Sequence, residues 1–313
     1  MSAIQKLTER WDEGYFVCVG LDSDPKKLPK HLLPDWERAT EEEVAEAQFQ
    51  FNKAIVDATK DIVCAYKPNL AFYRGAAGKK ALRLSIAYIH KVAPGVIVIL
   101  DAKQADIGNT NDGYVAEDFE WYGVDAVTIH PYLGMEAMKP FLDRADKLVI
   151  VLCRTSNEGA GEFQDVECTP VVDRYTNKLY STFEEAARAG VDRHDLEYGD
   201  HSWPLYQFVA YRVAQSWNYN GNCAVVVGAT WPEELESIRA IVDDMPILIP
   251  GLGAQGAEVE PTIKAGQTEE GRGMINNMSR AVIFASNGED FAEAARQVVL
   301  NVNAETDEYR TKT

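Results

Sequence analysis

The chain has 313 residues, of which 46% are hydrophobic and 26% are charged. These ordinary values for a globular protein exclude a collagen-like repeat, a largely disordered chain and a membrane protein. The formal net charge of -18 would repel nucleic acids and anionic membrane surfaces, so neither is an expected partner. An anionic metabolite can still bind where helix N-termini and a few basic side chains make a local positive site.

The N-terminal segment lacks the uninterrupted apolar stretch of a secretory signal peptide. No apolar stretch elsewhere approaches the ~20 residues of a membrane span. The five cysteines include no CxxC pair and lie mostly in apolar runs, which is typical of reduced core thiols rather than of disulfides or a metal site. We therefore expect a cytoplasmic protein.

Short β-rich runs recur along the chain, and longer segments of helical character lie between them. Continuous apolar runs of this kind are typical of parallel strands that are covered on both faces. The expected strands are residues 15–20, 62–67, 96–101, 125–130, 148–153, 224–228, 246–250 and 281–285. The expected helices are residues 41–60, 78–92, 111–122, 205–218, 232–243 and 288–302.

Eight strands that alternate with helices favour an α/β fold of the (β/α)8 TIM barrel type over a doubly wound open sheet. Residues 158–203 interrupt this rhythm between the fifth and sixth strands and are rich in charged side chains. They are too long for an ordinary loop, so we expect an insertion near the active-site face that serves as a lid, an oligomer contact or a mobile excursion. No internal repeat or low-complexity linker divides residues 1–313, which favours a single domain.

Ionisable residues cluster at the ends of the first three expected strands, where the catalytic groups of such barrels lie. Asp22, Lys67 and Asp101 follow or close these strands, and Lys103 and Asp106 come directly afterwards. Alternation along an extended strand end would put the side chains of Asp101 and Lys103 on one side, where each stabilises the ionised form of the other. One strand end cannot easily direct all three last side chains into one small pocket, so Asp106 can instead point across a subunit boundary.

The ionisable residues at the strand ends have two other interpretations. They could be solvated loop residues, although three ionisable residues within six positions after an apolar strand make this interpretation less attractive. They could also bind Mg²⁺ through the two carboxylates, but Lys103 lies between them and its ammonium can take the place of the cation. His130, at the end of the fourth expected strand, is interpreted as a hydrogen-bonded structural histidine rather than as an acid or base.

The run DAKQADIGNT, residues 101–110, resembles the DxKxxDI signature of orotidine 5′-monophosphate decarboxylases, in particular the longer form that continues as DIGNT. Further segments resemble other blocks of that family in the same order, from about residue 10 to about residue 300, excluding most of the insertion. These are CVGLDSDP (18–25), YKPNLAFY (66–73), LCRTSNEGAGEFQ (152–164), VVVGAT (225–230), PGLGAQGAE (250–258) and MSRAVIFAS (278–286). Single blocks are weak signals, but their ordered combination is highly specific.

The resemblance implies a decarboxylation of orotidine 5′-monophosphate to uridine 5′-monophosphate, the last step of de novo synthesis of that nucleotide, with no metal and no cofactor. Lys67, Asp101, Lys103 and Asp106 would form an alternating charge network, with Asp106 contributed by the neighbouring subunit of a homodimer. Lys103 would stabilise the developing carbanion and protonate it. The implied substrate-binding residues are Asp22, Asn69, Ile107, Thr110, Ser156, Pro250, Gln255 and Arg280.

These binding residues would divide the substrate between them. Asp22, Lys67 and Asn69 would lie at the ribose, Ser156 would hydrogen-bond the pyrimidine amide, Ile107 and Thr110 would come from the partner subunit, and Gln255 and Arg280 would hold the phosphate. The loops after the last two strands commonly form the phosphate site of such barrels, and an arginine can donate two hydrogen bonds to a phosphate. Ser279 stands where many family members have glycine, so the backbone contact at this point stays open.

Two alternative functions remain at this stage. One is a metal-dependent relative with the same barrel, such as a 3-keto-gulonate 6-phosphate decarboxylase or a hexulose phosphate synthase, whose motif typically continues as DxKxxDAG. The other is a catalytically silent nucleotide-binding or regulatory protein. The DIGNT continuation argues against the first, and the intact set of four ionisable residues argues against the second.

Overall fold

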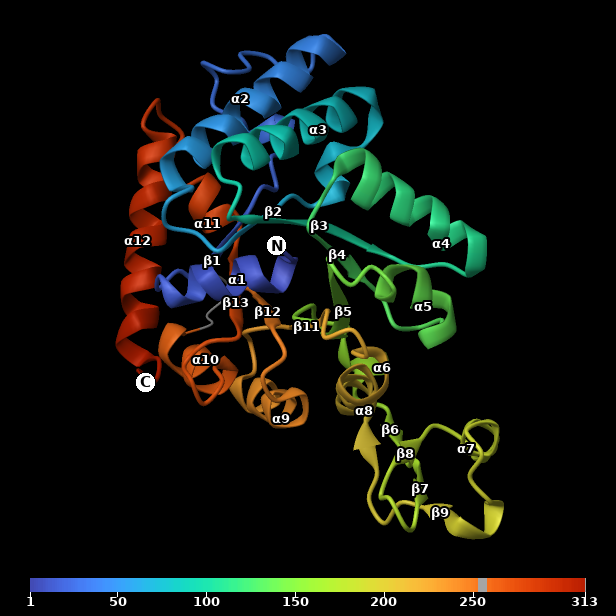
Figure 1. Ribbon diagram of the computed structural model, residues 1–313. Helices are drawn as coiled ribbons and strands as arrows, with labels where there is room; N and C mark the ends of the chain where they lie inside the picture. Colours follow the sequence, from blue (N-terminus) through green and yellow to red (C-terminus); the bar gives the residue numbers. More distant parts are fainter. Residues whose placement is uncertain (253–257, 313) are drawn as a thin grey trace.

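The computed structural model describes residues 1–252 and 258–312, and its centre is a closed barrel of parallel strands with helices around it (Figure 1). The strands follow one another around the barrel in chain order. They are β1 (Val17–Gly20), β2 (Ala65–Lys67), β3 (Ile97–Gln104), β4 (Ala126–Ile129), β5 (Leu148–Arg154), β11 (Cys223–Val227), β12 (Ile247–Pro250) and β13 (Met274–Met278). The predicted TIM barrel is therefore confirmed.

The eighth strand was predicted in the wrong place. It is β13, whereas the apolar run at residues 281–285 lies largely in the short helix α11 (Arg280–Ile283). Two asparagines interrupt the apolar character of β13, yet Asn276 and Asn277 are buried between the neighbouring strands β1 and β12. Arg280 consequently stands just beyond the C-terminal end of a strand, which is the end where barrel enzymes place their ligand groups.

The six predicted helices are all present. Besides α11 and the short helices of the insertion, the described residues contain three further helices that the sequence interpretation missed. The added helices are α1 (Ala3–Asp12), α5 (Met135–Leu142) and α10 (Val259–Gly266); the last two each contain a proline, which weakens a helical signal. The predicted ones are α2 (Glu41–Thr59), α3 (Gly75–Val92), α4 (Gly108–Val115), α8 (Leu205–Arg212), α9 (Pro232–Val242) and α12 (Phe291–Tyr309). Helices α4 and α8 continue as π-helical turns over Ala116–Tyr122 and Val213–Trp217. None of the described helices is long and apolar enough to cross a membrane.

Helix α2 shows how the sequence fixes an element that supports the site. Thr40 and Glu43 form a capping box that satisfies backbone N–H groups at its start. Gln48 and Asn52 lie on the buried face of this helix together with apolar side chains. Gln48 donates through Nε2 to the backbone oxygen of Ser23 at 2.8 Å, so the helix anchors the loop that follows β1.

Helix α1 covers the N-terminal end of the barrel. Trp11 donates through Nε1 to the backbone oxygen of Met274, where β13 begins, at 2.8 Å. Lys6 forms an ion pair with Asp125, the residue before β4, at 2.7 Å. These contacts close the end of the barrel opposite the C-terminal ends of the strands, which leaves the latter as the open face.

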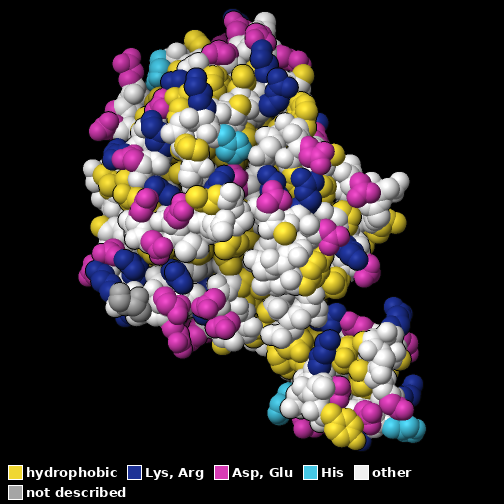
Figure 2. Space-filling model, in the orientation of Figure 1, with side chains coloured by type: hydrophobic (Ala, Val, Ile, Leu, Met, Phe, Trp, Pro, Cys, Tyr) yellow, Lys and Arg dark blue, Asp and Glu magenta, His cyan; other side chains and the backbone are white. Residues whose placement is uncertain are grey.

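The insertion builds a small unit of its own, which we call the arm (residues 167–204). Its strands β7 (Val171–Asp173), β8 (Leu179–Tyr180) and β9 (Leu196–Tyr198) form an antiparallel sheet beside α7 (Phe183–Arg188). A separate core of Val171, Tyr180, Ala186 and Leu196 holds it together. The strands β6 (Glu167–Cys168) and β10 (Trp203–Pro204) pair at its base after the short helix α6 (Gly161–Gln164), and the arm stands clear of the barrel (Figures 1 and 2).

Candidate active site

The ends of β2 and β3 bring three predicted residues into direct contact. The carboxylate of Asp101 accepts from Lys67 Nζ through Oδ2 at 2.7 Å and from Lys103 Nζ through Oδ1. Lys67 and Asp101 are only 4% and 7% exposed. The side chain of Lys103 is 47% exposed, so the array runs from the barrel interior toward the open face.

The contacts between these residues determine their charge states. Burial alone would raise the pKa of Asp101, but the ammonium groups of Lys67 and Lys103 outweigh it and hold this pKa well below its usual range. Burial alone would lower the pKa of Lys67, but Asp101 and Asp22 outweigh it and raise this pKa. Asp101 and Lys67 are therefore both ionised at neutral pH.

The backbone at Lys103 is unusual, because this residue adopts a left-handed conformation with φ 50°. The pairing between β3 and β4 shifts between Leu100 and Gln104, so the strand end is not regular. Thr128 bridges the irregular segment: its Oγ1 accepts from Lys103 N and donates to Asp101 Oδ1, both at 3.0 Å. A strained backbone held by its surroundings is typical of functional sites, and here it directs Lys103 back toward Asp101.

The residues after Lys103 are fixed by His130, which directly follows β4, and by Asp118 on the π-helical turn after α4. The backbone N–H of His130 donates to Gln104 O at 3.3 Å, and its ring nitrogen Nε2 lies 3.2 Å from Ala105 O. Gln104 donates through Nε2 to the buried carboxylate of Asp118. Burial and the neighbouring Glu117 raise the pKa of Asp118 to about 7. His130 thus makes the structural contacts that the sequence interpretation gave it.

Asp106, Ile107 and Thr110 are not part of this array. Asp106 Oδ1 accepts from the backbone N–H of Ile107 at 2.7 Å, and the side chain of Asn111 brackets the backbone of Asp106 from the start of α4. Ile107 is 62% exposed and Thr110 is also exposed. None of the three lines either cavity at the strand ends.

Two adjoining cavities of about 230 and 490 Å³ open at the C-terminal ends of the strands and share Lys67, Asp101, Ser156 and Pro250. The smaller one is also lined by Asp22, Asn69, Asn277, Ser279 and Arg280. The larger one is also lined by Lys103, Thr128, Thr155, Asn157 and Gln164. Eight of the predicted site residues therefore surround one continuous region. Asp106, Ile107 and Thr110 line neither cavity, and Gln255 lies outside the described residues.

The smaller cavity has polar groups that are free to meet a ligand. Arg280 is exposed at the start of α11 and forms no ion pair with an acidic side chain of the described residues. Asp22 Oδ1 is buried and accepts no hydrogen bond in the described part of the chain. The guanidinium of Arg280 and the free carboxylate oxygen of Asp22 suit a ligand that carries both an anionic group and hydroxyls.

The sequence interpretation missed the residues that shape the larger cavity. Gln164 accepts from Thr155 N through Oε1 at 3.0 Å and donates to its hydroxyl through Nε2 at 2.8 Å, which fixes the loop that carries Ser156. Gly228 lets this loop approach, because a Cβ there would lie 2.8 Å from the side chain of Ser156. Gly228 and Ser156 are distant in sequence, and Gln164 meets Thr155 only because the chain folds back over the segment between them.

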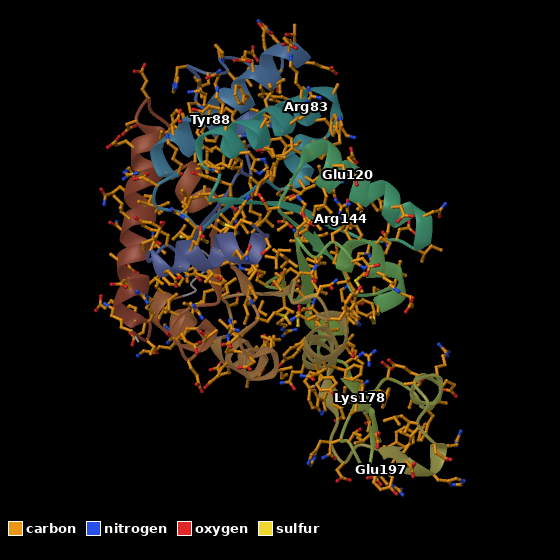
Figure 3. The ribbon with its side chains drawn as sticks, in the orientation of Figure 1. Arg83, Tyr88, Glu120, Arg144, Lys178 and Glu197 are labelled. Atoms are coloured by element: carbon orange, nitrogen blue, oxygen red, sulfur yellow. The ribbon has the colours of Figure 1, made fainter. Side chains whose placement is uncertain are left out.

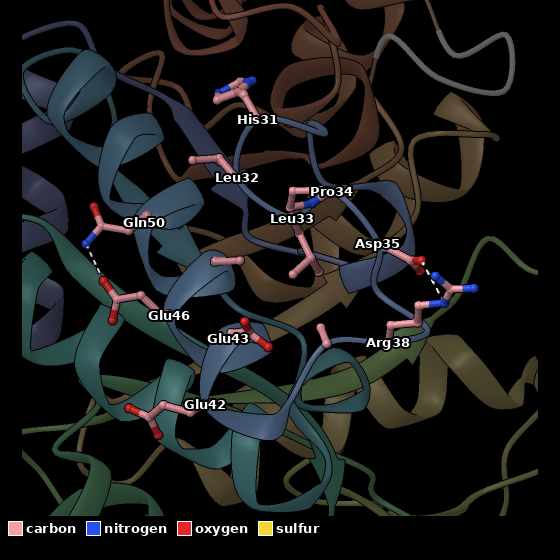
Figure 4. A pocket seen from close by; sticks show the side chains of 12 residues that line it. His31, Leu32, Leu33, Pro34, Asp35, Arg38, Glu42, Glu43, Glu46 and Gln50 are labelled. Carbon is pink, nitrogen blue, oxygen red and sulfur yellow. Dashed lines mark hydrogen bonds and ion pairs between the residues drawn. The ribbon is translucent and has the colours of Figure 1, made fainter.

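Another cavity, of about 640 Å³, lies between residues 31–39 and α2 (Figure 4). None of the predicted site residues lines it. Its charged lining is mixed, with Arg38 opposite Glu42 and Glu43. No residue of the barrel strands lines it, so it is separate from the two adjoining cavities.

Comparison with known proteins agrees with this geometry. Residues 16–297 match the family described as "Orotidine 5'-phosphate decarboxylase / HUMPS family". The chain is 44% identical to the orotidine 5'-phosphate decarboxylase of Cellvibrio japonicus, over 96% of this chain and 97% of that one, and 42% identical to that of Ralstonia pickettii, over 99% and 100%. The structure of Leishmania donovani OMP decarboxylase superposes with a TM-score of 0.73 at 32% identity, covering 98% of this chain and 99% of that one. The chain therefore belongs to the orotidine 5'-phosphate decarboxylase / HUMPS family.

Proposed function

We propose that this chain decarboxylates orotidine 5′-monophosphate to uridine 5′-monophosphate and CO2. The observation that carries the proposal is the array of Lys67, Asp101 and Lys103, which lines a cavity of about 490 Å³ at the strand ends. The similarity to proteins named as orotidine 5'-phosphate decarboxylases supports it. A cytoplasmic location belongs to the same proposal, because the buried cysteines are free thiols, which suit a reducing compartment.

The two cavities suggest how the substrate lies. The phosphate would bind Arg280 in the smaller cavity, and the ribose hydroxyls would meet Asp22, Lys67 and Asn69 at the boundary. The pyrimidine would then extend into the larger cavity beside Lys103, with Ser156 within reach of its amide. This orientation assigns the anionic end to the cation and satisfies the otherwise unpaired acceptor of Asp22.

The chemistry needs a group that stabilises and then protonates a carbanion. When the bond between C6 and the carboxylate breaks, CO2 leaves and the electron pair stays on C6. Lys103 donates a proton from its ammonium to that pair, and solvent restores the proton afterwards. Asp101 and Lys67 hold Lys103 in place and keep its surroundings charged, so little reorganisation is needed during the reaction.

A metal-dependent sugar-phosphate reaction is the second candidate, because the matched family description includes the HUMPS group. Both oxygens of Asp101 already accept from ammonium groups, which occupy the positions that a cation would take. The deciding experiment follows the loss of orotidine monophosphate absorbance on adding protein that has been exhaustively treated with chelator. Full activity is expected; activity that returns only with added metal would contradict the proposal.

We further propose a homodimer with shared active sites, in which Asp106, Ile107 and Thr110 complete the site of the partner. Their absence from the lining of both cavities and the exposure of Ile107 support this. Inactive Lys103→Ala and Asp106→Ala proteins would be mixed under subunit exchange. One site of each heterodimer regains both residues, so about one site in four should recover in a random mixture. No recovery despite confirmed heterodimers would remove Asp106 from the neighbouring site.

A further inference from the structure

A cavity of about 860 Å³ adjoins the phosphate end of the proposed substrate site. It lies between residues 25–37, which follow β1, and the helix α11. Arg280 lines both this cavity and the smaller active-site cavity. A ligand that enters through this 860 Å³ cavity therefore meets Arg280 on its way to the strand ends.

The charge around this opening is the reverse of the charge on the whole chain. Lys26, Lys27, Lys30 and Arg280 line it, against two acidic residues. One of these acids, Asp35, is engaged by Arg38 at 3.5 Å, as Figure 4 shows. A local excess of positive charge on a protein with a formal net charge of -18 attracts anions to one place and leaves the rest of the surface repulsive.

The lysines at this opening are not neutralised by neighbouring acids. Within the part of the chain that the structure describes, the lysines that form no ion pair with an acidic side chain are Lys26, Lys27, Lys30, Lys91, Lys139 and Lys178. Half of them line this one cavity. Lys26 Nζ instead lies 4.6 Å from the centre of the Trp36 ring, a contact that positions the ammonium without cancelling its charge.

The segment that carries the lysines is anchored to the site. The side chain of Asp24 caps the short helix Pro25–Lys27 by accepting from Lys26 N at 3.1 Å. Leu28 and Leu33 are each 6% exposed and pack into the barrel core. Asp22 lies just before this segment and lines the active-site cavity, so the lysines are held at a fixed place beside the proposed substrate site.

We propose that Lys26, Lys27 and Lys30 form a basic rim that captures the phosphate monoester of the substrate and passes it to Arg280. This rests on the proposed function, since it concerns the route by which the same polyanionic nucleotide arrives. Long-range repulsion by the chain slows the approach of such a ligand, and a local positive field offsets it. The rim acts on capture alone, so it affects kcat/KM and leaves kcat unchanged.

The test compares two triple variants that change the net charge equally. K26Q/K27Q/K30Q removes the rim, and K91Q/K139Q/K178Q removes three other unpaired lysines, of which Lys178 lies on the arm (Figure 3). Turnover of orotidine monophosphate is measured at low and high ionic strength. We expect kcat/KM of the rim variant to fall about 10-fold at low salt, with kcat unchanged, and the deficit to shrink below about 2-fold in 0.5 M salt.

The control variant should retain wild-type kcat/KM at both salt concentrations. Equal losses in the two variants would show that only global charge matters, and no loss in the rim variant would remove the rim; either result overturns the proposal. A lowered kcat in the folded rim variant would also overturn it, because the lysines would then act after capture. Absence of turnover in the wild-type protein would instead refute the proposed function, so the two failures are distinguishable.

Discussion

The two halves of residues 101–110 are adjacent in sequence but differ in how they are held. Asp101 and Lys103 are fixed by groups from β2 and β4, and Asp101 is almost fully buried. Among the described residues, the hydrogen bonds of the Asp106 side chain and backbone are to Ile107 and Asn111, and Ile107 is largely exposed. The charged motif therefore has two parts: one is completed by contacts within the chain, and the other lines neither cavity and is partly or largely exposed.

The physical reason for this difference is the cost of burying charge. A carboxylate inside a barrel must be paired and hydrogen-bonded, and Asp101 has the buried Lys67 and Thr128 as partners in addition to the half-exposed Lys103. Asp106 is partly exposed and can rely on water and on one backbone N–H group. Substitutions in and around both parts of the motif test this contrast.

Lys103→Ala should reduce kcat by at least about 10⁴-fold, because it removes both the proton donor and the cation at the developing carbanion. The side chain is half exposed, so the thermal midpoint should change little. Steady-state kinetics and thermal unfolding would check both, with Lys91→Ala as an exposed lysine control. A kcat within 100-fold of wild type would contradict the proposed role.

Asp101→Asn should lower the free energy of unfolding by about 3–5 kcal/mol, because it leaves Lys67 buried without its counter-ion. Asp106→Asn should change it by less than about 0.5 kcal/mol, because no buried charge loses its partner. Urea unfolding would measure both. The double variant Lys67→Met/Asp101→Leu should recover most of the loss, and equal destabilisation by the two Asn variants would remove the contrast.

Asp118 gives a pH-dependent test of the contacts behind the first half of the motif. Its pKa is raised from 3.8 to about 7 in the folded chain, so folding favours the protonated form and stability falls as pH rises between these values. Between pH 5 and pH 8, wild type should lose about 3 kcal/mol relative to Asp118→Asn. Urea unfolding at the two pH values would measure this. Parallel stability profiles for the two proteins would show that Asp118 does not titrate in this range.

Arg280→Ala should lower kcat/KM by about 10- to 100-fold, which corresponds to one charge-assisted contact with the phosphate. The folded state should be unaffected, because Arg280 is exposed and forms no ion pair with the described residues. Kinetics with the full nucleotide and with the nucleoside that lacks the phosphate would measure the contribution. The nucleoside should not distinguish the variant from wild type; an equal loss with both substrates would place Arg280 elsewhere.

The sequence predicted most of the barrel because parallel strands covered on both faces must be continuously apolar. It failed at β13, where Asn276 and Asn277 are buried, and it assigned the apolar residues 281–285 to a strand although most of them form α11. Hydrophobic periodicity cannot distinguish a short buried helix from a short buried strand. Neighbouring strands β1 and β12 decide the matter, because β13 is hydrogen-bonded between them.

For the site, the sequence alone identified the ionisable residues at the strand ends, since such residues are conspicuous after apolar runs. It did not identify the supporting contacts of Thr128 with Asp101 and Lys103, of Asp118 with Gln104 or of Gln164 with Thr155, because folding creates these contacts. Nothing in the sequence indicates the left-handed backbone conformation of Lys103. The order of apolar and charged residues thus determined the barrel and its charged centre. Tertiary structure decided which charges meet, because the buried carboxylate of Asp101 needs partners and the partly exposed carboxylate of Asp106 does not.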